Sequence, residues 1–178
     1  MKQIKNYINE RLHLTSKIQY SCQAKTKKEL QEIIIQRIKD DGLECDLNDI
    51  DVSNIDDMSG LFAVDLKKIF KNFNGDISHW DVSNVTNMNA MFYGCEKFNG
   101  DISKWDVSNV EDTHYMFSYC RKFNCNLSNW DMSKVKNMYA MFACCTNFKQ
   151  NLDDWNVSNV ENMKYAFKDC QTRPKWYK

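Results

Sequence analysis

The chain is poor in proline, glycine and histidine, and it has no excess charge of either sign. Its 178 residues include one proline, five glycines and three histidines, and its 24 basic residues balance its 24 acidic residues. A neutral chain lacks the basic stripe that phosphate recognition requires, so we expect no nucleic-acid partner. It also has no apolar run of about eighteen residues, so we expect no membrane span.

Catalytic and export signals are also missing. His13, His79 and His114 stand at unrelated positions, and no glycine-rich phosphate loop or nucleophile motif is present. We therefore expect a protein that is not an enzyme, with no cofactor, no bound metal and no evident small-molecule substrate. The opening residues lack the apolar core of a signal peptide, which predicts a cytoplasmic location.

Eight cysteines argue against disulfides by their positions. Four of them hold one recurring position, at Cys95, Cys120, Cys145 and Cys170. If repeats advance by roughly 5 Å, the first and last sulfurs lie on the order of 15 Å apart, too far to share one zinc ion. We expect a buried, reduced row, as in a reducing cytosol.

Four tryptophans reveal internal repetition. They stand 25 residues apart, at Trp80, Trp105, Trp130 and Trp155. A fixed period predicts stacked units that share one core, and we expect the tryptophans to lie in that core and not on a ligand platform. The repeats divide the chain into an N-terminal cap (1–42), a degenerate first repeat (43–72), four 25-residue repeats (73–170) and a C-terminal tail (171–178).

Two apolar patterns predict the structure of each unit. The spacing from Ile77 to Val85 matches the leucine-rich-repeat pattern, which begins with a short strand. From Val85 to Cys95 the apolar residues follow a helical stripe, with a polar start and Gly94 near its end. We therefore expect an α/β leucine-rich-repeat-like solenoid of about five strand-turn-helix units.

Residues 1–42 lie outside the repeat and predict a helical (α+β) cap. A short helix is expected over 1–14 and a weak strand over 17–24. A second helix is expected over 26–41, which begins with a capping box at Thr26 and buries Leu30, Ile33, Ile34 and Ile38. This segment covers the first repeat or, alternatively, forms a partner-binding helix pair.

An acidic row recurs between the tryptophan and valine positions, at Asp51, Asp81, Asp106 and Asp131, with Asn156 completing it. The Ser-Asn that follows favours an Asx turn, in which each carboxylate accepts a backbone N–H two residues on. A calcium-binding row is the alternative. A second row, at Asp76, Asp101, Asn126 and Asn151, also predicts turns.

Outward positions that vary from unit to unit are the candidate binding residues. One set is expected beside the strands: His79, Lys104, Asn129 and Asp154. The other is expected on the helices: Tyr115, Tyr139 and Tyr165. Tyrosine is enriched at interfaces, so we expect the helix side to carry recognition, with the strand side as the alternative.

The segment from Trp80 to Phe92, with Cys95 and the preceding Phe-Asn-Gly-Asp-Ile-Ser, resembles the BspA-like leucine-rich-repeat family. The resemblance implies a solenoid and a protein–protein interaction role in a bacterial or phage setting. The function expected is a non-catalytic repeat scaffold that binds a protein partner. The alternatives are an exported surface adhesin and a phage- or mobile-element-encoded intracellular inhibitor of a host protein.

Overall fold

The computed structural model describes residues 20–63 and 68–178. Its regular elements lie near the N-terminus: β1 (Cys22–Gln23), α2 (Lys27–Asp41), β2 (Ile50–Asp51) and the 3₁₀ helix η1 (Lys68–Asn72). β1 and β2 pair in parallel, with Cys22 opposite Ile50. From residue 73 onward the chain consists of turns and isolated bridges. Over the described residues, no helix has both the length and the apolar character needed to cross a membrane.

The helix α2 begins and ends where its local sequence dictates. Thr26 Oγ1 accepts the N–H of Glu29 at 3.2 Å, which satisfies a free donor of the first turn. Gly42 adopts a φ of 92° at the other end, and its N–H donates to Ile38 O. The helix expected over 26–41 is confirmed. The broader helical (α+β) cap is not found, because α2 is the one α-helix in the part of the chain that the structure describes, and the helix expected over 1–14 lies outside that part.

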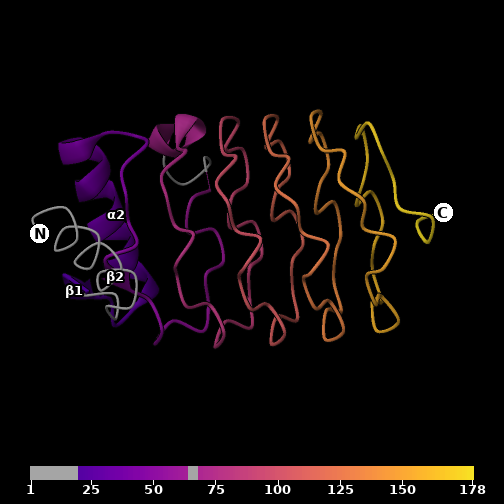
Figure 1. Ribbon diagram of the computed structural model, residues 1–178, viewed down its shortest axis with the longest axis horizontal. Helices are drawn as coiled ribbons and strands as arrows, with labels where there is room; N and C mark the ends of the chain where they lie inside the picture. Colours follow the sequence, from indigo (N-terminus) through magenta and orange to yellow (C-terminus); the bar gives the residue numbers. More distant parts are fainter. Residues whose placement is uncertain (1–19, 64–67) are drawn as a thin grey trace, which may run out of the picture.

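The repeats form coils that lie side by side along the long axis of the molecule, beginning next to α2 (Figure 1). We number them coil 1 (43–72), coil 2 (73–97), coil 3 (98–122), coil 4 (123–147) and coil 5 (148–170). Parallel bridges join one equivalent residue in each coil to the next, in the order Asp57, Asn87, Asp112, Asn137 and Asn162. The repeat period is therefore the length of one coil.

Each coil is a series of tight turns. The N–H of one core residue donates to the carbonyl of the core residue three positions earlier. In coil 2 these pairs are Ile77 with Trp80, Val82 with Val85, Met88 with Met91, and Phe92 with Cys95. These turns place a buried side chain at both ends.

The expected α/β leucine-rich-repeat-like solenoid of strand-turn-helix units is therefore wrong. The spacing i, i+3 that suggested a helix from Val85 to Cys95 comes from successive β-turns, which share that spacing with a helix. Ala90 and Gly94, with φ of 50° and 75°, also interrupt any helical path. The strand expected around Trp80 is likewise replaced by turns.

Aromatic rings fill the core in continuous columns. One column joins the phenylalanines near the end of each coil, with ring centroids 5.2–5.6 Å apart, at Phe62, Phe92, Phe117, Phe142 and Phe167. A second column, with centroids 6.0–6.1 Å apart, joins Phe73, Phe98, Phe123 and Phe148. The four repeat tryptophans are 4–5% exposed, so their placement in the core is confirmed.

Candidate binding surface

The acidic rows are held by their own turns. Asp81 Oδ1 accepts the N–H of Ser83 at 3.1 Å, and the same bond recurs at each equivalent position. The second row does the same, as where Asp101 Oδ1 accepts the N–H of Ser103 at 3.0 Å. The Asx-turn interpretation is confirmed, because each carboxylate is already engaged locally. Across the described residues, no group of three or more His, Cys, Asp or Glu side chains could hold a metal ion.

The cysteine row lies inside the coils. All eight cysteines are free, and Cys95, Cys120 and Cys145 are fully buried. Each thiol of the row donates to a carbonyl of the preceding coil, as where Cys120 Sγ lies 3.0 Å from Phe92 O. Burial raises the pKa of all three thiols well above the usual value for cysteine. These side chains are packing residues and offer no accessible thiolate.

Five tyrosine rings form a continuous surface across coils 2 to 5. We call this set the tyrosine surface, and its members in order of contact are Tyr119, Tyr93, Tyr115, Tyr139 and Tyr165. Neighbouring ring centroids lie 5.2–6.0 Å apart, and all the contacts are edge-to-face. A side-chain hydrogen bond with Tyr139 raises the pKa of Tyr115 above its usual value. The rings therefore support one another while their outer parts stay accessible, with Tyr119 and Tyr165 about 40% exposed.

Turn geometry positions these rings. Tyr115, Tyr119 and Tyr165 have φ of 57°, 64° and 63°, the left-handed region that the third residue of a type II turn requires. Tyr139 follows an Asx turn, in which its N–H donates to Asn137 Oδ1 at 3.1 Å. The tyrosines thus project from turns, and the expectation that Tyr115, Tyr139 and Tyr165 lie on helices is wrong.

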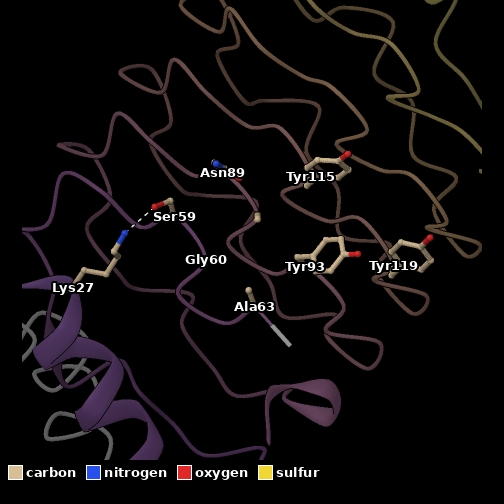
Figure 2. A pocket seen from close by; sticks show the side chains of 9 residues that line it. Lys27, Ser59, Gly60, Ala63, Asn89, Tyr93, Tyr115 and Tyr119 are labelled. Atoms are coloured by element: carbon tan, nitrogen blue, oxygen red, sulfur yellow. Dashed lines mark hydrogen bonds between the residues drawn. The ribbon is translucent and has the colours of Figure 1, made fainter. Parts of the chain in front are cut away.

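A pocket of about 710 Å³ lies at the N-terminal end of the tyrosine surface. Figure 2 shows Tyr93, Tyr115 and Tyr119 on one side of it and Lys27 with Ser59 on the other. Small residues leave the space between them: Gly60, Ala63 and Ala90. The pocket therefore has an aromatic wall and a polar wall.

The polar wall is fixed by an ion pair between α2 and coil 1. Lys27 Nζ lies 2.7 Å from Asp57 Oδ2 and donates to Ser59 Oγ at 2.8 Å. Although partial burial pushes the pKa of Asp57 upward, its hydrogen bonds with Lys27 and Ser59 hold that pKa below its usual value. The Lys27 ammonium is thus neutralised by Asp57, and the pocket has no unpaired cation at this point.

The other candidate set lies in a different turn. His79, Lys104, Asn129 and Asp154 are all exposed, each next to the tryptophan of its coil. None of them lines the pocket. The structure places these four not beside strands but on the turns that end at each tryptophan and begin three residues earlier, at Ile77, Ile102, Leu127 and Leu152.

Sequence reasoning missed Tyr119 and Lys27 as members of this site. Tyr119 occupies the repeat position of Gly94 and Cys144, where a glycine or a small side chain hides the pattern. Lys27 comes from outside the repeats and reaches the pocket because α2 packs on coil 1. Alignment of the repeats could have identified Tyr119 but not Lys27.

The site and the fold define a repeat protein of stacked, turn-rich coils. The chain belongs to the family described as "Mycoplasma protein of unknown function, DUF285", whose model matches residues 64–176. This overturns the resemblance to the BspA-like leucine-rich-repeat family, and with it the leucine-rich-repeat description of the chain. Neither the curated proteins nor the solved structures contain a significant match.

Proposed function

We propose that the chain is a non-catalytic repeat scaffold that binds another protein through the tyrosine surface. The observation that supports this most is the unbroken contact of five tyrosine rings across four coils. Tyrosine offers a large contact area at a small loss of side-chain entropy and is enriched among residues that dominate binding. The adjacent pocket gives a partner side chain a place to insert.

The pairing of the rings also favours binding over a purely structural role. The core is already filled by phenylalanine and tryptophan columns, so the tyrosines add little to it. Their edge-to-face contacts hold each ring in place, which lowers the entropy that a partner must remove on binding.

The test is to isolate a partner from native lysate, identify it, and measure binding with both purified proteins. The double variant Tyr115→Ser/Tyr139→Ser should weaken binding by roughly tenfold or more, as expected for central interface residues. The matched control is Tyr20→Ser, because Tyr20 is 42% exposed but lies outside the tyrosine surface.

Lys104→Glu tests the other candidate set in the same assay. If Lys104→Glu abolishes binding while the tyrosine double variant binds normally, recognition lies with His79, Lys104, Asn129 and Asp154, and the proposal is wrong. The adhesin and inhibitor alternatives differ from this proposal in compartment and partner, and cell fractionation separates them.

A further inference from the structure

The two ends of the tyrosine surface differ in how far they are open to a partner. At the C-terminal end, Lys164 Nζ lies 4.8 Å from the ring centroid of Tyr165, and Lys168 Nζ lies 5.7 Å from it. The last ring of the surface is therefore already engaged by cations of its own chain. Within residues 20–63 and 68–178, no cation lies over Tyr115 or Tyr119, which line the pocket at the other end. The pocket end is thus where a partner can reach the rings.

The pocket is close to electrically neutral. Among the described residues that line it, Lys27 is the one with a charged side chain. Lys27 Nζ lies 2.7 Å from Asp57 Oδ2, so its charge is compensated. Recognition of a phosphorylated or acidic segment requires a cluster of unpaired cations, which these walls do not supply. An uncharged group therefore suits the pocket best.

The backbone that carries the rings has no free N–H group for a partner strand. Every backbone N–H from 88 to 95 donates to an oxygen of this chain, and so does every one from 113 to 120. A segment that adds to a sheet as a further strand needs unpaired backbone groups along the edge. The tyrosine surface therefore cannot extend into a sheet with its partner.

Polar side chains do remain available at this surface. In the described part of the chain, the side-chain amide of Asn89 has no hydrogen-bond partner, and it lies in the pocket wall. The hydroxyl groups of Tyr115 and Tyr139 share one hydrogen bond, which uses one of their two hydrogens. The other hydrogen can be donated outward. The surface thus offers hydrogen-bond donors that need acceptors on the partner.

These donors distinguish a polyproline II helix from an α-helix as the partner element. The carbonyl groups inside an α-helix already accept N–H groups of the same helix, so an α-helix docked here leaves the amide of Asn89 without a backbone acceptor. A polyproline II helix has no internal hydrogen bonds, and its carbonyl groups stay free. The extended helix therefore satisfies the donors that the α-helix leaves unpaired.

The aromatic wall also suits proline. Figure 2 shows Tyr93, Tyr115 and Tyr119 along this wall. The ring of Tyr93 meets those of Tyr115 and Tyr119 edge-to-face, with centroids 6.0 and 5.8 Å apart. Rings at an angle to one another form hollows, and grooves lined by aromatic rings are the usual docking site of proline-rich segments. Such segments are stiff before they bind, so little chain entropy is lost on docking.

We propose that the tyrosine surface binds a proline-rich segment of the partner protein, docked as a polyproline II helix with one proline ring in the pocket. The segment packs on Tyr115 and Tyr119, and its carbonyl groups accept hydrogen bonds from Asn89 and from the Tyr115–Tyr139 pair. This inference rests on the proposed function, because it names the partner element that the same surface recognises.

The test compares two libraries of displayed peptides on the immobilised full chain. Both present about four turns of polyproline II helix, or about twelve residues. One library has proline fixed at every third position, the other has alanine fixed there, and the remaining positions are random in both. The proline library should yield at least about tenfold more bound clones. Synthetic copies of the selected peptides are then measured by fluorescence anisotropy.

Two variants locate the bound peptide. Tyr115→Ser/Tyr119→Ser should weaken peptide binding by about tenfold or more, as expected for aromatic residues at the centre of an interface. Asn89→Ala removes one donor and leaves the rings in place, so it should weaken binding about three- to tenfold. The matched control Asn147→Ala removes an exposed amide outside the tyrosine surface and should leave binding unchanged.

Equal recovery from the two libraries would overturn the inference. Peptides that bind Tyr115→Ser/Tyr119→Ser and Asn89→Ala as tightly as the natural chain would do the same. The partner isolated from lysate separates this result from the proposed function. If Tyr115→Ser/Tyr139→Ser weakens binding of that partner but the proline library yields no binder, the tyrosine surface binds a protein and the polyproline II inference is wrong.

Discussion

At the scale of the residue, the unusual feature is a left-handed backbone at residues other than glycine. Seven non-glycine residues in the described chain have φ between 50° and 64°. This region costs an ordinary residue roughly 1–2 kcal/mol, and type II turns usually place Gly or Asn there. In five of the seven the backbone N–H donates to a carbonyl of the next coil, and these hydrogen bonds hold the conformation, at Ala90, Tyr115, Tyr119, Ala140 and Cys144.

Glycine should therefore stabilise one of these positions. Ala140 has φ of 51° and is buried, so Ala140→Gly should raise the free energy of unfolding by about 0.5–1 kcal/mol in urea titrations. Ala143 is also buried in the same coil, but its backbone is not in the left-handed region. Ala143→Gly should therefore lower the free energy of unfolding by a similar amount. A loss of stability in both variants would show that Ala140 carries no strain.

Burial of the cysteine row predicts slow reaction with thiol reagents. Cys95, Cys120 and Cys145 should resist labelling in the native protein and react fully in denaturant, because burial both shields them and raises their pKa. Cys22 and Cys144 are partly exposed and serve as internal controls that should label first. Peptide mapping by mass spectrometry distinguishes the sites. Early labelling of Cys120 would contradict the buried row.

At the scale of the element, α2 could be predicted and the coils could not. The capping residue Thr26 and the apolar stripe Leu30, Ile34 and Ile38 are signals within one short segment. The hydrogen bonds that form the helix lie within the same segment. In the coils, the spacing between Val85 and Cys95 fits either a helix or successive turns. Hydrogen bonds to the next coil decide between them, and these join residues about 25 positions apart.

The sequence likewise predicted only part of the candidate site. Repeat alignment marked Tyr115, Tyr139 and Tyr165 as variable and outward, and the structure joins them in one surface. The prediction that they lie on helices was wrong, because the spacing of the apolar residues comes from successive turns. Lys27 was not foreseen, since its place depends on how α2 packs against coil 1.

The buried tryptophans should contribute strongly to the contact between neighbouring coils. Trp105 is 5% exposed, and its Nε1 donates to Ile77 O at 3.1 Å. Trp105→Ala should lower the free energy of unfolding by about 3–5 kcal/mol in chemical denaturation. Trp105→Phe keeps the ring packing and removes the Nε1 donor, while Ile77 O still accepts the N–H of Trp80, so the variant should cost about 0.5–1.5 kcal/mol. A loss under about 1 kcal/mol for the alanine variant would argue against a core role.

At the scale of the whole molecule, the Asx turns couple stability to pH. The pKa of Asp101, Asp106 and Asp131 is lowered, first by the side-chain hydroxyl of the serine two residues later and then by its backbone N–H. A lowered folded pKa means that the unfolded chain takes up protons at a higher pH than the folded one. The stabilisation is therefore complete above the unfolded pKa of about 3.9 and is lost as pH falls through the folded value.

Replacing these carboxylates should flatten the acid limb of the stability curve. The triple variant Asp101→Asn/Asp106→Asn/Asp131→Asn keeps the turns, since Asn126 and Asn156 already accept the same bond in their coils. Its melting temperature should fall less than that of the natural chain between about pH 5 and pH 2, measured by circular dichroism. Parallel curves for the two proteins would show that these carboxylates do not set acid sensitivity.

The turns that carry the tyrosines also give one segment of each coil a local electrical direction. In coils 2, 3 and 4, four alternate backbone N–H groups of this segment point toward the next coil, and a peptide unit carries a dipole of about 3.5 D. Within this segment the dipoles of successive coils add head to tail, as they do in an α-helix. Other N–H groups, such as those of Asp76, Glu111 and Lys136, point to the preceding coil, so the polarity belongs to this segment and not to the whole molecule.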